Sequence, residues 1–259
     1  MKSYNKSNLI IDSLLTQKEI FGDELYTSLN LEKIKTSGFS KIEQPRPLDL
    51  NVEEKEIKKE PVIHQSNIDT GFMNAKSIDE LFKTINNCKK CSLGETRTKF
   101  VFGTGNPNAD ILLVGEAPGA EEDKTGEPFV GRAGKLLTDI LGAIDIKRED
   151  VFIANILKCR PPNNRTPVPE EVLTCIPYLK KQIDLIKPKM ILCLGVTAAN
   201  GLLNAKNSLT KMRGNVYEFH NVKLMVTYHP AALLRNPNWK KECWEDVQKF
   251  KKLYLEMIK

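Results

Sequence analysis

Four of the six cysteines are spaced so that their thiolates can share one inorganic centre. Cys88 and Cys91 form a CxxC pair, in which two intervening residues let both sulfurs converge, and Cys159 and Cys175 follow with fifteen residues between them. Four thiolates bind tetrahedral zinc or an iron–sulfur cluster, provided that the fold brings the two pairs together. A redox role for the CxxC pair is disfavoured, because no thioredoxin-like βαβ pattern surrounds it. The spacing alone leaves zinc and a cluster both open.

A second group of side chains combines an acid, an aromatic ring, an amide and an imidazole. Glu116, Asn155 and His229 each lie at or just past the end of an apolar run typical of a strand, and Phe129 lies in the loop after Glu116. Because the carboxyl ends of parallel strands meet at one edge of a sheet, these four side chains can share one cleft. An aromatic face, a carboxamide and an imidazole are the groups needed to sandwich and read a nucleobase.

The longest loop of this cleft belongs to the stretch GEAPGAEEDKTGEPFVGRAGKLL, residues 115–137. Its glycines permit close backbone approach, and the helix-like run that opens at residues 131–134 offers free N–H groups to a phosphate. The stretch has neither a GxxxxGK[ST] loop nor a GxGxxG pattern that opens the helix, so it is not a nucleotide loop of those kinds. An ordinary strand–loop–helix turn explains it equally well.

The elements that must position these residues alternate along the chain. Four β-rich apolar runs are predicted as strands, and helix-like stretches lie between or after them; the strands are Ile111–Val114, Val151–Ile156, Met190–Leu194 and Leu224–Tyr228, and the helices are 132–143, 169–187, 196–204 and 239–257. A further helix begins at Ser77, with Glu80 at the capping-box position. Such alternation predicts an α/β fold with a mainly parallel sheet and helices on both faces.

Composition divides the 259 residues into two parts. Residues 1–80 carry 11 Lys and Arg against 14 Asp and Glu, a net charge of −3, and the remainder carries +9, which suits a polyanionic partner. Residues 1–75 are predicted to be an extension with short helices near 8–20 and 22–35 and a proline-rich linker, or alternatively a docking tail. We expect no membrane span and no signal peptide, and cysteines in a reducing compartment point to the cytoplasm.

From about residue 80 onward the chain resembles the family 4, iron–sulfur-containing uracil-DNA glycosylases of bacteria and archaea. The resemblance rests on five motifs in order: CxxC at 88–91, GEAPG at 115–119, EPFVGRAG at 127–134, NILKCRPPNNRTP at 155–167 and HPAALLR at 229–235. It implies a three-layer αβα sandwich with a central, mainly parallel four-stranded sheet. It also implies a [4Fe-4S] cluster on Cys88, Cys91, Cys159 and Cys175, which replaces the generic zinc interpretation.

The resemblance further implies a pocket in which Phe129 stacks on uracil, Asn155 reads its edge and His229 contacts O2. The residue after Glu116 is Ala117, where the best-known uracil glycosylases have an aspartate that orients the attacking water. Glu116 is therefore the first candidate for activating water and Glu122 the second, unless Glu122 instead crowds C5 and rejects the methyl group of thymine.

The expected activity is flipping uracil out of single- or double-stranded DNA and hydrolysing its N-glycosidic bond, which leaves an abasic site. We expect a monomer that grips DNA through Arg132 at the helix start and through the segment Ala231–Arg235, with Leu233 or Leu234 as a wedge and Arg235 on a phosphate. The alternative is an inert, cluster-bearing DNA-binding domain tethered to replication machinery, because the aspartate is missing.

Overall fold

Residues 71–259 form a sheet of six strands, in the order β1-β3-β2-β4-β6-β5. In the computed structural model, which describes residues 71–259, the strands are β1 (Thr104–Gly105), β2 (Ile111–Gly115), β3 (Phe152–Asn155), β4 (Met190–Leu194), β5 (Tyr217–Phe219) and β6 (Val222–Thr227). The inner neighbours β3, β2, β4 and β6 pair in parallel, whereas β1 and β5 pair antiparallel at the two edges. The expectation of a four-stranded sheet is therefore wrong: the sheet is mixed and six-stranded, since two short edge strands carry no apolar run.

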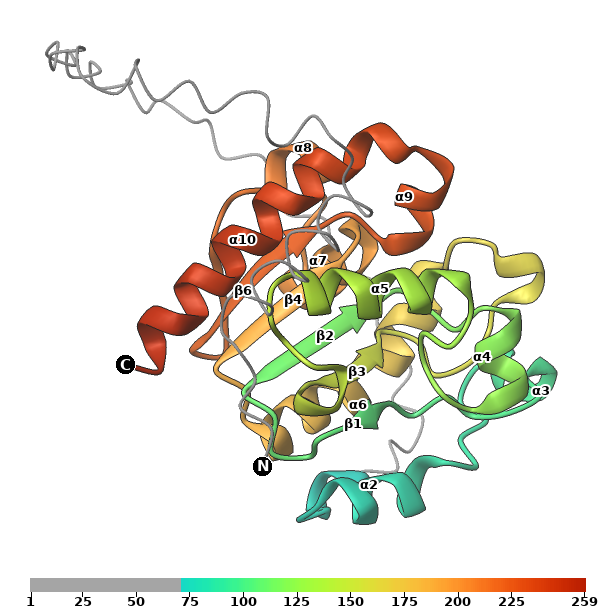
Figure 1. Ribbon diagram of the computed structural model, residues 1–259. Helices are drawn as coiled ribbons and strands as arrows, with labels where there is room; N and C mark the ends of the chain where they lie inside the picture. Colours follow the sequence, from blue (N-terminus) through green and yellow to red (C-terminus); the bar gives the residue numbers. More distant parts are fainter. Residues whose placement is uncertain (1–70) are drawn as a thin grey trace, which may run out of the picture.

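Helices cover both faces of this sheet (Figure 1). The long helices match the expected ranges; they are α2 (Ile78–Ile85), α5 (Arg132–Ala143), α6 (Pro169–Ile186), α7 (Val196–Leu203) and α10 (Lys240–Met257). Between them lie shorter helices, α3 (Leu93–Thr96), α4 (Ala120–Thr125), α8 (Leu209–Met212) and α9 (Pro230–Arg235), and the 3-10 turns η3 (Gly71–Asn74), η4 (Arg148–Asp150), η5 (Pro162–Asn164) and η6 (Pro237–Trp239).

The alternation of side chains along each strand builds two separate cores. On β2, Leu112 and Val114 pack with α2, α6 and α7, whereas Ile111 and Leu113 point to the opposite face and pack with α5 and α10. Both faces of the inner strands are buried, which is why these strands read as continuous apolar runs. The parallel centre therefore places the carboxyl ends of four strands at one rigid edge.

The predicted start of α2 is confirmed. Ser77 is the N-cap, and its hydroxyl accepts a hydrogen bond of 3.1 Å from the Glu80 N–H. The Glu80 carboxylate reaches back one residue further than a capping box requires and accepts from the Lys76 N–H at 2.7 Å. The helices expected near 8–20 and 22–35 lie outside the described residues.

The described part of the chain begins before the expected domain boundary. Phe72 in η3 is only 4% exposed and belongs to the core on the α6 side of the sheet, so the boundary expected at residue 76 separates it from the body it packs on. Among the described residues, no helix is long and apolar enough to cross a membrane.

Candidate active site

A pocket of about 450 Å³ opens at the carboxyl ends of β2, β3, β4 and β6. It brings together most of the residues expected to form the site; its lining includes Glu116, Ala117, Glu122, Phe129, Asn155, His229 and Arg235. Those side chains come from segments up to about a hundred residues apart in the sequence. The shared edge of the parallel strands is what unites them, as the strand-end argument predicted.

The floor of the pocket depends on a glycine. A Cβ atom on Gly115 would lie 2.3 Å from Asn155 Oδ1 and 2.7 Å from Phe129 Cζ, so no other residue fits at the end of β2. Asn155 is 2% exposed, and its Oδ1 has no hydrogen-bond partner in the described part of the chain. A buried acceptor without a partner lowers the stability of the fold by about 1–3 kcal/mol. This oxygen is available to accept a hydrogen bond from a ligand.

The Phe129 ring is held by a strained backbone. Phe129 has φ of +54°, a left-handed conformation that is uncommon for a bulky residue. Arg148 stabilises it by donating to the carbonyls of Pro128 at 2.9 Å and Phe129 at 3.1 Å. The ring lies 5.4 Å from that of His229, tilted by 30°. A strained backbone that is held in place by neighbouring contacts is typical of a ligand-binding position.

Glu122 is occupied by the backbone of its own loop. Its Oε1 accepts from the N–H groups of Val130 at 3.0 Å and Gly131 at 3.1 Å, and its Oε2 accepts from the Gly119 N–H at 3.1 Å. Both carboxylate oxygens of Glu122 are therefore engaged by backbone donors. This geometry speaks against the expected catalytic use of Glu122 and makes it the residue that ties the Phe129 loop to α4.

His229 follows β6 and caps the start of α9. Its Nδ1 accepts a hydrogen bond of 3.1 Å from the Ala231 N–H, so the neutral ring carries its proton on Nε2. Burial is the main reason that the pKa of His229 is lowered to about 4; nearby Arg235 contributes to the shift, and Glu122 opposes it. At neutral pH the imidazole is therefore an uncharged Nε2–H donor in the wall of the pocket.

Of the predicted DNA-contacting residues, one is buried and the others are exposed to solvent. Leu233 is 0% exposed and packs in the core with α5 and α10, so its assignment as a wedge is wrong. Leu234 is 43% exposed, and Arg235 and Arg132 are exposed as well. The sequence could not show which of the two leucines is exposed, because adjacent residues of a short helix differ only in the direction in which their side chains point.

The four predicted metal ligands come from both halves of the domain and lie close to one core. Cys88 and Cys91 pack against the same apolar cluster that contains the buried Cys159 and Cys175. Arg97 donates to Cys159 Sγ at 3.2 Å, and the Tyr178 hydroxyl donates to Cys88 Sγ at 3.2 Å. In the described chain, no three His, Cys, Asp or Glu side chains are grouped tightly enough for a single metal ion.

A buried lysine links these cysteines to the pocket. The fully buried Lys158 donates to the Asn155 carbonyl at 2.9 Å and to Gln182 Oε1 at 2.6 Å. Burial lowers its pKa to about 8, and Cys175 and Cys159 oppose that shift. Burial also raises the pKa of Cys175 to about 12, against the effect of Lys158. Lys158 opposes that rise only in part, because the desolvation of the buried thiol is the larger effect.

Sequence reasoning missed Arg148 and Arg165 and foresaw only part of the role of Gly115. Gly115 begins GEAPG, whose glycines were expected to permit close backbone approach, but its contacts with Asn155 and Phe129 were not foreseen. Arg148 lies in a charged turn outside the motifs. Arg165, within NNRTP, lines the pocket and pairs with the buried Glu171 at 2.6 Å.

Fold and pocket together define a doubly wound α/β protein with an aromatic, amide- and imidazole-lined pocket at the carboxyl ends of its parallel strands. The model of the uracil DNA glycosylase superfamily matches residues 102–248, and the chain belongs to that family. It is similar to the type-4 uracil-DNA glycosylase of Archaeoglobus fulgidus, with 47% identity over 186 residues that cover 69% of this chain and 94% of that protein. The type-4 enzymes of Sulfurisphaera tokodaii (46% identity; 68% and 84% covered) and Thermotoga maritima (48%; 64% and 89%) are similar as well.

Proposed function

We propose that this protein is a uracil-DNA glycosylase, which hydrolyses the N-glycosidic bond of uracil in DNA and leaves an abasic site. The observation that carries the proposal is the buried Asn155 Oδ1, which has no partner among residues 71–259, beside Phe129 and the Nε2–H of His229 in one pocket. The type-4 names of relatives that the chain matches over nearly their full length support it. A duplex hides the base, so the nucleotide must flip out to reach this pocket.

Asn155 and Phe129 would select the base. Uracil offers an N3–H donor and an O4 acceptor, and a carboxamide offers the complementary acceptor and donor. The N3–H supplies the partner that Oδ1 lacks. Cytosine presents the reverse pattern and would leave both groups of Asn155 mismatched, a penalty that buried polar groups make large. The Phe129 ring stacks on the base and excludes water from these bonds.

His229 would stabilise the leaving group. Breaking the glycosidic bond leaves negative charge on uracil O2 and positive charge on the sugar. A neutral Nε2–H donor beside O2 lowers the energy of that anion, an oxyanion-type effect worth about 3–4 kcal/mol. The Ala231 N–H keeps the proton on Nε2, so the donor is in place before the reaction begins.

Glu116 is the proposed acid that orients the water. Its side chain lines the pocket directly after β2, and no described residue pairs with its carboxylate. Ala117 leaves space in the pocket where an aspartate is missing. Glu122, with both oxygens engaged, keeps the Phe129 loop in place instead.

Cys88, Cys91, Cys159 and Cys175 are the residues that would hold a [4Fe-4S] cluster. Arg97 and Tyr178 donate to two of the sulfurs, as is common for thiolate ligands of clusters, and all four cysteines lie in or against one apolar core. When bound, the cluster would cross-link the segment before β1 to the loop after β3 and to α6. Free thiols fit a reducing compartment.

The DNA grip is assigned to Leu234, Arg235 and Arg132, which are exposed near the mouth of the pocket on α9 and α5. Leu234 would fill the gap left by the flipped base, and the arginines would contact phosphates.

The test is excision from a uracil-containing oligonucleotide, single-stranded and in duplex, followed by alkali to break abasic sites. We expect cleavage at uracil and none in a matched oligonucleotide with thymine. Binding of DNA without alkali-labile sites would instead support an inert DNA-binding domain.

A further inference from the structure

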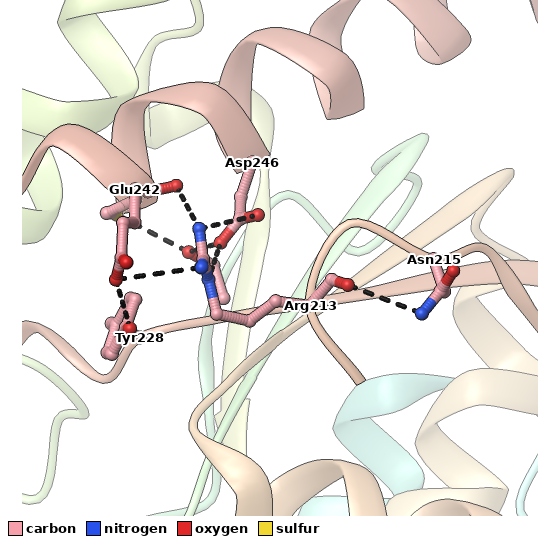
Figure 2. Close-up of polar contacts among 7 residues, drawn as sticks. Arg213, Asn215, Tyr228, Glu242 and Asp246 are labelled. Atoms are coloured by element: carbon pink, nitrogen blue, oxygen red, sulfur yellow. Dashed lines mark hydrogen bonds and ion pairs between the residues drawn. The ribbon is translucent and has the colours of Figure 1, made fainter. Parts of the chain in front are cut away.

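A polar cluster that includes the two residues before His229 plays no part in the chemistry described above. It joins α8, α10 and the end of β6, and its members are Arg213, Thr227, Tyr228, Glu242 and Asp246 (Figure 2). We propose that this cluster, centred on Arg213, positions His229 for catalysis. The inference rests on the proposed function, because it assigns His229 the task of contacting uracil O2.

Arg213 binds two acidic residues of α10 at once. Its Nε donates to Asp246 Oδ2 at 2.9 Å and its Nη2 to Asp246 Oδ1 at 3.3 Å, so the pair is bidentate. Nη2 also donates to the Glu242 carbonyl at 2.6 Å, and Nη1 lies 3.6 Å from Glu242 Oε2. Asp246 is 3% exposed. The guanidinium therefore has a fixed place relative to α10.

The same acids bind the two residues that precede His229. The Thr227 hydroxyl donates to Asp246 Oδ2 at 2.9 Å, and the Tyr228 hydroxyl donates to Glu242 Oε2. The Tyr228 ring lies between the Arg213 guanidinium, 4.9 Å from its centroid, and the Trp239 ring, stacked at 5.1 Å. The side chains of Thr227 and Tyr228 are thus both bonded to acidic residues of α10.

His229 has little freedom to absorb a shift at Tyr228. Gly195 approaches so closely that a Cβ there would lie 3.3 Å from His229 Cβ, and Pro230 begins α9 directly afterwards. A movement of Tyr228 would therefore tilt the imidazole and weaken its bond to the Ala231 N–H. Displacements of about 1 Å at a catalytic group can lower a rate by about 10²-fold.

A purely stabilising role would not require this arrangement. Replacing a buried ion pair with apolar side chains of similar volume is often neutral or stabilising, because the charges lose their hydration. What apolar packing lacks is direction: the bidentate pair and the two hydroxyl donors fix the orientation of the segment that bears His229. The cluster is therefore suited to holding the His229 segment in one orientation.

Tyr228→Phe tests the proposal, since it removes the hydroxyl and keeps the ring between Arg213 and Trp239. Arg213→Lys is the second variant, as it keeps the charge but loses the bidentate contact. Tyr254→Phe is the matched control, because Tyr254 on the same helix donates to Asp110 at 3.1 Å, away from the pocket. Uracil excision is measured with enzyme in excess, alongside DNA affinity, melting temperature and the nitrogen NMR shifts of His229.

We expect both variants to lower the excision rate by about 10- to 100-fold with DNA affinity kept within about twofold. His229 should show both tautomers instead of the Nε2–H form alone, and the control should behave like the parent. A parental rate and a parental His229 spectrum in Tyr228→Phe would overturn the proposal, as would an equal loss in Tyr254→Phe or failure of both variants to fold. A parent that excises no uracil refutes the proposed function instead, while the His229 spectra still test the positioning.

Discussion

Asn155 is the residue whose chemistry most directly sets base choice. Asn155→Asp replaces the amide donor with a carboxylate oxygen, which repels uracil O4 and accepts from the amino group of cytosine. Burial at this position raises the pKa of a carboxyl group, so a protonated form can serve cytosine N3. We expect uracil release to fall by at least about 10²-fold and weak cytosine release to appear at lower pH. Excision of uracil at the parental rate in oligonucleotide assays would exclude Asn155 as the reader.

His229 gives the protein a defined dependence on pH. Its pKa in the folded state is about 4, below the ordinary value of 6.5, so the unfolded chain binds the proton first. The contribution to stability is complete above pH 6.5 and is lost as the pH falls towards 4. In urea titrations the parent should lose stability in this window more steeply than His229→Gln, by up to about 1.4 kcal/mol per pH unit. Parallel slopes would show that the imidazole titrates normally.

At the scale of elements, helix α5 carries two glycines with opposite roles. A Cβ on Gly134 would lie 1.8 Å from the Phe129 carbonyl oxygen, whereas one on Gly142 would meet no atom of the described residues within 4 Å. Gly134→Ala should displace the Phe129 loop, cost about 1–3 kcal/mol and impair uracil excision. Gly142→Ala, the matched control, should gain about 0.5–1 kcal/mol and leave excision unchanged. Urea unfolding and excision rates of the two variants test this prediction. Equal effects at both glycines would contradict the close approach of Gly134 to the Phe129 carbonyl.

Two adjacent leucines of helix α9 are expected to have different roles, one in stability and the other in DNA contact. Leu233→Ala empties a core position and should cost about 2–5 kcal/mol. Leu234→Ala should change stability by less than about 0.5 kcal/mol. It should lower excision from duplex DNA by roughly 10-fold, because the wedge offsets the cost of unstacking. Single-stranded substrate is the control, since it needs no wedge. A duplex rate unchanged by Leu234→Ala would remove this residue from the DNA interface.

Over the whole molecule, the sequence predicted the features that depend on local pattern. Apolar runs located the four parallel strands, and strand ends located Glu116, Asn155 and His229 in one pocket. The pattern could not reveal that Glu122 binds N–H groups eight and nine residues away, or that Arg213 meets Asp246 thirty-three residues on. Such contacts depend on how loops and helices pack in the tertiary structure, and the spacing of residue types along the sequence does not predict them.

The N-terminal boundary gives a test on the full chain. The sequence predicts residues 1–75 to be an extension outside the domain, but Phe72 is buried against Tyr178, with ring centroids 4.8 Å apart, and Tyr178 donates to Cys88 Sγ. A chain that starts at Gly71 should keep its turnover on short oligonucleotides. A chain that starts at Lys76 should lose roughly 3–5 kcal/mol of stability, on the scale of Phe→Ala in a core.

The shorter chain should also retain less iron and less visible absorption per protein, because the support behind Cys88 is gone. Phe72→Ala in the full-length chain is the matched control and should reproduce both losses. If instead the chain from Gly71 folds, binds iron and yet turns over slowly, residues 1–70 contribute to catalysis or to the DNA grip. If the chain from Lys76 matches the parent in stability and iron content, the packing of Phe72 on Tyr178 does not support the cysteine site.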